Sequence, residues 1–322
     1  MFFQYRQIFK HHSFDYVFTY TVKPNVYASI AASFNKLPTI SVVSGRGYSY
    51  VRNGWLNKLV KRLYRFAIKY NEQVWFVNKD DLQFFVDEKL VEKNKTQLLP
   101  GEGVNTKYFS RVNYSNHNKN DTMNFLFSGR LIWSKGLNHY IEAAKYIQQK
   151  YPNTRFNLLG YFGVQNPDAI AIEQIEAWQT AGIVKYEGFT DDVRPFLAKT
   201  DCFILPSYYG EGTPRSLLEA ASMEIPIITT DSVGCKEVVK NGVNGYLCQP
   251  KETKDLIDKI EQFIQLSWQE RLDMGKNGRI IVKQLFDEQL VVPYYLDLLF
   301  PSVLNGKTSK TNSISSEIVN KE

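Results

Sequence analysis

The chain has 322 residues, of which 43% are hydrophobic and 22% are charged. This balance is typical of a folded globular protein, excludes a disordered chain, and leaves room for two α/β domains. The net charge of +6 fits phosphorylated substrates or an anionic membrane, and because no aromatic-basic module of a nucleic-acid reader is present, no nucleic-acid partner is expected.

Short apolar runs alternate with segments of helical spacing in the first third of the chain. A helix-like segment at residues 2–9 is followed by predicted strands at residues 16–20, 39–43, 74–78 and 96–99. This alternation predicts a parallel sheet of βαβ units over residues 1–110. Because a doubly wound domain usually has five or more strands, we expect this domain to be incomplete at its start.

A second series of strands follows a polar, Asn-rich stretch at residues 111–122, which we interpret as a linker. The second domain, residues 123–286, has predicted strands at residues 124–128, 155–160, 184–187, 202–205, 226–230 and 245–248. Helices are predicted at residues 138–150, 215–223 and 254–266, and a C-terminal helix at residues 287–300. The Ser/Thr/Asn/Lys-rich tail, residues 301–322, is expected to be disordered.

The strongest chemical signal lies at residues 206–220, PSYYGEGTPRSLLEA, between a predicted buried strand and a helix. Thr213 suits the helix cap and Pro214 the first turn, and a helix N-terminus at the carboxyl end of a strand is a seat for phosphate. Glu211 and Glu219 cannot share a helical face, so they would contact different parts of one ligand, and carboxylates accept hydrogen bonds from vicinal hydroxyls. The spacing alone carries no information; the strand-loop-helix setting gives it weight.

A second signal, residues 125–136 (FLFSGRLIWSKG), opens the second domain. Gly129 allows a sharp turn after the strand, and Arg130 and Lys135 place two cations near the strand's carboxyl end. Two cations are what a diphosphate leaving group needs. The alternative is a solvated loop that happens to be basic.

Together with residues 187–193 and 230–247, these motifs make the chain resemble the family 4 glycosyltransferases from about Asp15 to Tyr295. Residues 206–220 carry that family's Glu-x7-Glu signature. The resemblance implies an α/β GT-B fold, with two doubly wound Rossmann-like domains facing a cleft and the first domain truncated. It also implies a nucleotide-sugar donor bound by the second domain, retention of anomeric configuration, and neither metal nor other cofactor.

By motif position, the resemblance gives catalytic roles to Glu211, which would hold the transferred sugar, and to Arg130 and Lys135, which would hold the diphosphate. Glu219 would hold the ribose, and Gly129 belongs to the same donor site. The backbone around the start of the helix would face the sugar and phosphates, at Gly212, Thr213, Pro214, Arg215, Ser216 and Leu217.

Within the family, residues 19–27 and 44–48 look like bacterial enzymes that extend lipid-linked repeat units of capsule, O-antigen or protein glycans. This resemblance implies a UDP-sugar donor, such as an N-acetylated hexosamine, and a lipid-diphosphate-linked or polysaccharide acceptor. Predicted acceptor contacts are Lys23, Asn25, Gly45 and Gly47, although residues 45–47 could equally form a simple turn. The family often has a histidine where this chain has Phe18, and no other residue is an obvious base, so the leaving phosphate would take the acceptor proton.

Residues 55–70 predict a basic amphipathic helix. One side carries Lys58, Lys61, Arg62, Arg65 and Lys69, and the other carries Leu56, Leu59, Val60 and Leu63. Such a helix can lie on an anionic leaflet, and the alternative is a solvated face over an ordinary core stripe. We expect a cytoplasmic, peripheral protein on the inner face of the membrane. The sequence has no apolar run long enough to span a bilayer and no signal-peptide pattern, and its three cysteines are scattered.

Three activities remain open from the sequence. The first is an active retaining transferase, the second an inactive remnant that lost part of its acceptor domain, and the third a nucleotide-sugar epimerase on the same fold. The intact pair Glu211 and Glu219 favours transfer.

Overall fold

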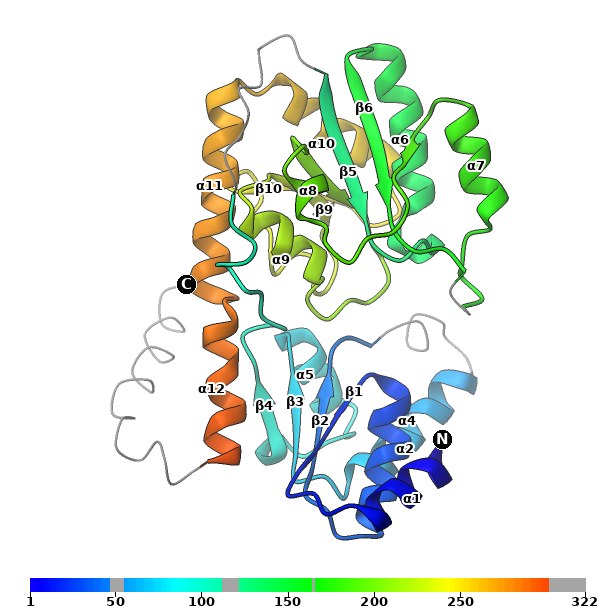
Figure 1. Cartoon of the computed structure of the whole chain (residues 1–322), viewed down its shortest axis with the longest axis vertical. Helices are drawn as coiled ribbons and strands as arrows, with labels where there is room; N and C mark the ends of the chain where they lie inside the picture. Colours follow the sequence, from blue (N-terminus) through cyan, green and yellow to red (C-terminus); the bar gives the residue numbers. More distant parts are fainter. Residues whose placement is uncertain (47–54, 112–121, 164–165, 301–322) are drawn as a thin grey trace.

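Two parallel β-sheets, each flanked by helices, lie one above the other along the long axis of the molecule (Figure 1). The computed structural model describes residues 1–46, 55–111, 122–163 and 166–300, with the side chains of residues 55 and 56 excepted. The linker predicted at residues 111–122 therefore lies outside the described residues except at its two ends. The disordered tail predicted at residues 301–322 and Gly47 lie wholly outside them.

The N-terminal sheet has four parallel strands in the order β1-β2-β3-β4. Along β2 and β3, consecutive side chains enter two different cores, as the two-residue period of a strand requires. Val74 and Phe76 pack with the helices on one face, whereas Trp75 and Val77 face the other side. The strands are Val17–Tyr20 (β1), Thr39–Val43 (β2), Gln73–Phe76 (β3) and Thr96–Leu98 (β4), and the helices are Phe2–His11 (α1), Val22–Ser33 (α2), Trp55–Ile68 (α4), Lys79–Asp87 (α5) and Lys93–Lys95 (η1).

The C-terminal sheet has six parallel strands in the order β10-β9-β8-β5-β6-β7, and the order reverses between β8 and β5. In open parallel sheets, ligands bind at the carboxyl ends of strands at such a reversal. The strands are Met123–Ser128 (β5), Thr154–Leu159 (β6), Lys185–Tyr186 (β7), Cys202–Leu205 (β8), Ile227–Thr230 (β9) and Gly245–Cys248 (β10). The helices are Trp133–Lys135 (η2), Leu137–Lys150 (α6), Ile172–Thr180 (α7), Arg194–Leu197 (α8), Arg215–Ser222 (α9), Thr253–Gln265 (α10), Trp268–Leu285 (α11) and Glu288–Leu299 (α12).

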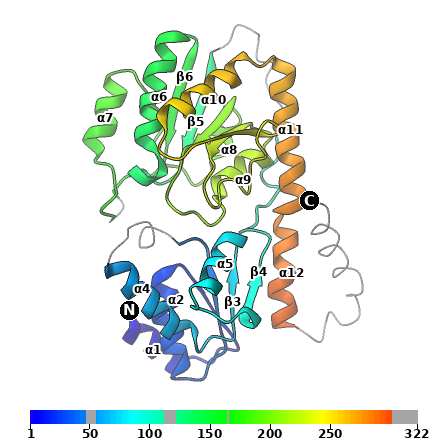
Figure 2. The same ribbon diagram turned by 180° about the vertical axis from the view of Figure 1, so that it is seen from behind.

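The last two helices link the domains. Helix α11 runs beside the C-terminal sheet, and α12 continues down beside the N-terminal sheet (Figures 1 and 2). Val291 of α12 is buried against the sheet face that Trp75 and Val77 occupy, and it is joined there by Tyr294, Tyr295 and Leu298. The final helix therefore completes the core of the first domain.

The chain crosses between the domains twice, and the two crossings are hydrogen-bonded to each other. Val104 donates its N–H to Phe286 O (2.9 Å) and accepts from the Glu288 N–H (3.0 Å). The Thr106 hydroxyl donates to the Asp287 carboxylate, and Asp287 also caps α12 by accepting from the Gln289 N–H (2.9 Å). The hinge is therefore a paired structure.

The predicted strands and helices agree with the structure to within one or two residues, and the expected fold class of two doubly wound domains is confirmed. Helix α2 was not predicted, because it is apolar on most sides and carries Pro24, which a first helical turn tolerates. No helix within the described parts of the chain is long and apolar enough to cross a bilayer.

Candidate functional site: the facing edges of the two sheets

The loop after β8 carries the predicted phosphate seat. Helix α9 begins at Arg215, as predicted, with Pro214 as its N-cap and no side-chain cap among the described residues. The prediction that Thr213 caps the helix is wrong, because its hydroxyl donates instead to Val77 O (3.2 Å) in the other domain. The first N–H groups of α9 are thus left available to an anion at the positive end of the helix dipole.

Glu211 and Lys135, predicted from two separate motifs, form one buried ion pair. Lys135 Nζ lies 2.5 Å from Glu211 Oε1, and each side chain is only 10% exposed. The Ser207 hydroxyl donates to the same carboxylate oxygen (2.7 Å). Burial strengthens such a pair and fixes its geometry.

Gly136 brings these two loops together. Its φ of +80° is in the left-handed region that favours glycine, and a Cβ at this position would lie 1.9 Å from Pro206 O. Only glycine fits this close approach. It allows the end of η2, which carries Lys135, to lie directly against the start of the loop that carries Glu211.

Arg130 lies beside this pair but remains exposed. Its guanidinium is 5.0 Å from the centroid of the Tyr209 ring, and Lys135 Nζ is 5.8 Å from the same centroid. Tyr209 therefore orients both side chains that are predicted to bind the diphosphate, through cation–π contacts. No role was predicted for Tyr209, although it lies inside the signature loop.

Glu219 lies on the second turn of α9 and pairs with Arg215, whose Nε is 3.2 Å from Glu219 Oε1. The pKa of the Glu219 carboxyl is raised, because the effect of burial exceeds the opposing effect of the Arg215 charge. Arg215 itself is largely exposed. The two glutamates of the signature thus have separate cation partners, in keeping with separate roles.

The other predicted donor-site residues differ in what they can offer. Leu217 is fully buried in the core, so it could contact a ligand only through its backbone. Pro214 is also buried. Ser216 and Gly129 are half-buried. Gly212 is buried where the domains meet, with Ser44 and Val77 against it.

The N-terminal domain meets the signature loop directly. Asn78, after β3, donates from Nδ2 to Gly212 O (3.1 Å), and Lys236 Nζ pairs with Asp80 Oδ2 (2.9 Å). Gly45 lies against Gly212, where a Cβ on either residue would clash with the backbone of the opposing loop. The carboxyl-end loops of both sheets therefore face one another in contact.

The predicted acceptor contacts are only partly placed at this junction. Gly45 is there, whereas Lys23 is exposed on α2. Asn25 is a correction: it is fully buried, and its Nδ2 donates to Val42 O (3.0 Å), so it holds α2 on the sheet instead of facing an acceptor. The predicted acceptor segment thus forms a helix, α2, whose inner face packs on the sheet.

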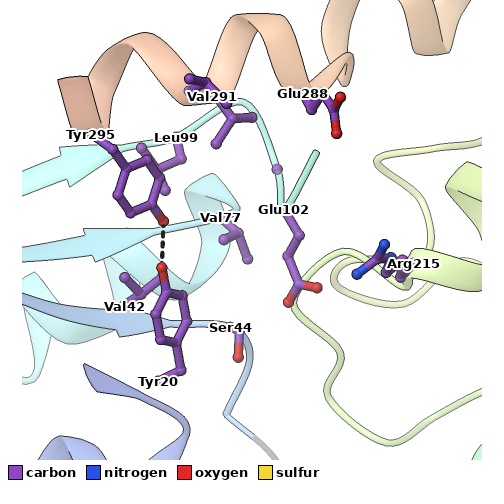
Figure 3. A pocket seen from close by; sticks show the side chains of 12 residues that line it. Tyr20, Val42, Ser44, Val77, Leu99, Glu102, Arg215, Glu288, Val291 and Tyr295 are labelled. Carbon is purple, nitrogen blue, oxygen red and sulfur yellow. Dashed lines mark hydrogen bonds between the residues drawn. The ribbon is translucent and has the colours of Figure 1, made fainter. Parts of the chain in front are cut away.

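A cavity of about 410 Å³ opens between the domains beside α12 (Figure 3). The Tyr20 and Tyr295 hydroxyls are hydrogen-bonded across it (2.8 Å), and the Glu102 carboxylate points from the hinge segment toward Arg215. None of Tyr20, Glu102 and Tyr295 was predicted as a site residue. They come from β1, the first crossing and the last helix, so no local motif unites them.

Exposed aromatic rings gather where β6 and β7 end. Tyr161 stacks on Phe162 and meets Phe189 edge to face, with ring centroids 6.1 and 5.8 Å apart, respectively. The Leu131 N–H donates to Tyr161 O (3.3 Å), which fixes the cluster beside the loop of Arg130. This cluster was not predicted either, because the pair Tyr161 and Phe162 follows one strand and Phe189 follows another.

Helix α4 buries a different face in the domain core than the one predicted. Tyr64, Ala67 and Ile68 are buried, whereas Leu59 (42% exposed) and Leu63 (37% exposed), expected on the apolar side, face solvent. Two predicted membrane cations are engaged within the domain: Lys61 pairs with Glu88 (2.8 Å) and Arg65 donates to the Glu88 and Lys89 carbonyls. Lys58, Arg62 and Lys69 are exposed, as is Phe66.

Known proteins resemble this chain over most of its length. It is 29% identical over 311 residues to the Campylobacter jejuni N,N'-diacetylbacillosaminyl-diphospho-undecaprenol alpha-1,3-N-acetylgalactosaminyltransferase, which covers 92% of this chain and 80% of that protein. It is 25% identical to the Escherichia coli UDP-Gal:alpha-D-GlcNAc-diphosphoundecaprenol alpha-1,3-galactosyltransferase, over 93% of this chain and 78% of that one.

Among solved structures, Anabaena Alr3699/HepE in complex with UDP and glucose superposes with a TM-score of 0.76 at 21% identity, covering 92% of this chain and 80% of that one. The shared fold is the GT-B fold that the sequence predicted. The family described as "Glycosyl transferases group 1" matches residues 112–280, which include both donor-site motifs and more than half of the chain. The protein is therefore a glycosyltransferase and belongs to the glycosyl transferases group 1 family.

Proposed function

We propose that this glycosyltransferase is a retaining, family 4 enzyme that moves a sugar from a UDP-sugar to a saccharide on a lipid diphosphate. The observation that carries the proposal is the buried Lys135–Glu211 pair, with Arg130 beside it and the N-terminus of α9 following it. The named substrates of the two relatives, both diphospho-undecaprenol-linked acceptors, support the acceptor class, and the name of the second supports a UDP donor.

The chemistry follows from where charge develops. As the bond between the anomeric carbon and the phosphate breaks, negative charge grows on the diphosphate, and stabilising that charge is the largest task. Arg130 and Lys135, with the N–H groups of α9, supply the positive charge without a metal in this proposal.

Glu211 then has two duties. Before the donor binds, it neutralises Lys135 (2.5 Å) in a buried setting. When the diphosphate competes for Lys135, the Glu211 carboxylate becomes available to accept hydrogen bonds from the hydroxyls of the transferred sugar. Glu219, on the next turns of α9, would accept from the ribose, and the aromatic cluster of Tyr161, Phe162 and Phe189 offers an apolar surface for the base.

UDP should raise the melting temperature, and EDTA should leave that shift unchanged. Ligand at a hundredfold excess over its Kd stabilises the folded state by about 2.7 kcal/mol. Because Glu219 is assigned to the ribose, Glu219→Ala should weaken UDP about tenfold to a hundredfold, the loss of one hydrogen bond to a charged group. Thermal shift and isothermal titration measure both effects.

The control for this experiment is Glu252→Ala, which removes an exposed glutamate from the end of a different helix. It should bind UDP like the wild type. Loss of the UDP shift in EDTA would disprove the metal-free site, and unchanged UDP affinity in Glu219→Ala would remove the ribose assignment.

Binding to anionic vesicles should depend on α4. Lys58 and Arg62 of α4, and Lys69 just after its end, are exposed, as are Leu59, Leu63 and Phe66. This arrangement suits the inner leaflet, where each cation contributes about 1 kcal/mol. Changing the three cations to Glu should reduce flotation with vesicles containing phosphatidylserine, most strongly at low salt. A triple change of Lys145, Lys254 and Lys283 to Glu, with the same charge difference on the other domain, is the control. Equal loss in both variants would rule out a specific membrane face.

A further inference from the structure

We propose that Asp168 is a positioning residue of the donor site, whose carboxylate fixes the short helix η2 so that Lys135 meets the diphosphate. The inference rests on the proposed function and deepens it, because it adds a residue that lies outside both donor-site motifs. Asp168 acts through Ser134 and Lys135, and it needs no contact of its own with the donor.

The Asp168 carboxylate is bonded twice to the residue that precedes Lys135. Its Oδ2 accepts the backbone N–H of Ser134 (2.9 Å) and also the Ser134 hydroxyl. Ser134 is only 4% exposed, so bulk water competes little for either bond. Hydrogen bonds to a charged acceptor are about twice as strong as those between neutral groups. Asp168 therefore holds both the backbone and the side chain of Ser134.

This carboxylate takes the place of a local helix cap. The N-cap of η2 is Ile132, whose side chain carries no hydrogen-bond acceptor, so the first N–H groups of the turn need partners from elsewhere. Asp168 supplies two of them from the segment between β6 and α7. Its carboxylate accepts from Ser134, and its backbone carbonyl accepts the N–H of Trp133 (2.9 Å).

Backbone pairing keeps Asp168 against the turn. Ile170 donates its N–H to Leu131 O (3.1 Å), and residues 132 and 169 form an antiparallel bridge. Residues 166–171 lie between β6 and α7, at the side of the C-terminal domain that faces the N-terminal domain (Figure 1). The segment that carries Asp168 and the segment that carries Lys135 are thus fixed to each other at the donor-site edge of the sheet.

The signature loop holds Ser134 from the other side. Tyr208 donates its N–H to Ser134 O (2.9 Å). The backbone N–H and C=O of Ser134 are therefore both engaged, one by Asp168 and one by Tyr208, and the next residue leaves this anchored position toward Glu211. Lys135 Nζ meets Glu211 Oε1 at 2.5 Å. Two anchors on the residue before it leave the Lys135 backbone little freedom to move.

Such anchoring matters when the donor binds. In the proposed function the diphosphate competes with Glu211 for Lys135, so the Lys135 side chain must change its partner while its backbone stays in place. Preorganised charge stabilises a transition state because it does not have to be reoriented as the reaction proceeds. A displacement of about 1 Å is enough for a hundredfold loss of rate. Asp168 prevents that displacement.

The test is Asp168→Ala, which removes the acceptor and leaves Lys135 and Glu211 unchanged. We expect kcat to fall by about 10²-fold and UDP to bind about tenfold more weakly. Uridine, which lacks both phosphates, should bind as it does to the wild type. The measurements are isothermal titration with UDP, NMR titration with uridine, and kinetics with a panel of UDP-hexoses and UDP-N-acetylhexosamines, using N-acetylglucosamine diphosphate on a short prenyl chain as acceptor. Equal losses of UDP and uridine affinity would overturn the inference.

A double-mutant cycle shows whether Asp168 acts through Lys135. In the Lys135→Ala background, Asp168→Ala should change UDP affinity and kcat by less than about twofold, because the side chain that it positions is already gone. The cycle can be completed on UDP affinity alone if the double variant is too slow to assay. Losses that multiply in the double variant would mean that Asp168 acts independently of Lys135, and the proposal would be wrong.

Asp168→Asn tests position against charge. The amide keeps an oxygen that can accept both bonds from Ser134, so this variant should recover kcat to within about tenfold of the wild type. An Asn variant as slow as the Ala variant would show that the negative charge of Asp168, and not its hold on Ser134, is what the reaction needs.

Asp201→Ala is the matched control. Asp201 is half-buried like Asp168, and its Oδ2 also accepts a backbone N–H, that of Asn124 (2.7 Å), but at the amino end of β5 and away from the donor loops. Asp201→Ala should lower the melting temperature and keep kcat. If it slowed transfer as much as Asp168→Ala, the effect would be one of domain stability and the inference would fall. Failure of the wild type to bind UDP would instead refute the proposed function.

Discussion

Lys135→Ala is expected to lower kcat by about 10²–10³-fold, the usual effect of removing one preorganised group that stabilises charge in a transition state. Lys135 is buried beside Glu211, and the developing charge of the diphosphate would meet it in a site that excludes much of the water. Arg130, exposed on the Tyr209 ring, cannot substitute for it at the same point. Steady-state kinetics with a UDP-sugar measures the effect.

The same substitution should also destabilise the protein, and a second variant separates the two effects. Lys135→Ala leaves the buried Glu211 carboxylate without this cation and with the Ser207 hydroxyl at 2.7 Å. Removing one partner of a buried ion pair costs about 3–5 kcal/mol. The double variant Lys135→Met, Glu211→Gln removes both charges and should recover most of the free energy of unfolding. It should remain inactive. Recovery of activity along with stability would show that Lys135 acts only on folding.

Gly212→Ala and Gly45→Ala should each lower kcat/KM by about 10²-fold while both domains stay folded. A Cβ on Gly212 would lie 2.6 Å from Ser44 C, and one on Gly45 would lie 2.5 Å from Gly212 N, so the facing loops must separate. Misplacement of reacting groups by about 1 Å is enough for a hundredfold loss. Circular dichroism and kinetics on the same preparations make the measurement.

The two glycines differ in a way that provides the control. Gly45 has a φ of +106°, so its substitution adds backbone strain to the clash. Gly182→Ala introduces a similar strain at φ +70° in open space, with no atom within 4 Å of the new Cβ. Gly182→Ala should lose a little stability and keep its activity. Full activity in Gly212→Ala would mean that the closed arrangement of the loops is not required.

Local pattern was enough to predict most of the fold. Buried parallel strands such as Cys202–Leu205 are continuous apolar runs, and helices such as Arg215–Ser222 follow them after a turn, so the sequence predicts both within a residue or two. The predicted donor-site loops meet for the same reason: they follow neighbouring parallel strands, β5 and β8, whose carboxyl ends share one edge.

What could not be predicted depends on contacts between distant segments. Thr213 precedes the helix as a cap residue would, but its hydroxyl donates a hydrogen bond to a carbonyl of the other domain instead. Glu102 lies in no motif, and its position follows from a hinge in which residues near 104 and 287 pair. On α4, apolar residues occur on two faces, and only the packing against α2 and the sheet decides that Tyr64 is buried and Leu63 is not.

The return of α12 to the first domain has a consequence for biosynthesis. The sheet of β1–β4 is made on the ribosome before the C-terminal sheet, yet one of its faces, with Trp75 and Val77, is covered by residues near 291–298. Domains generally fold as units as they are synthesised. The β1–β4 domain is therefore started before the C-terminal domain and completed after it, and this apolar face stays uncovered by α12 until that helix has been made.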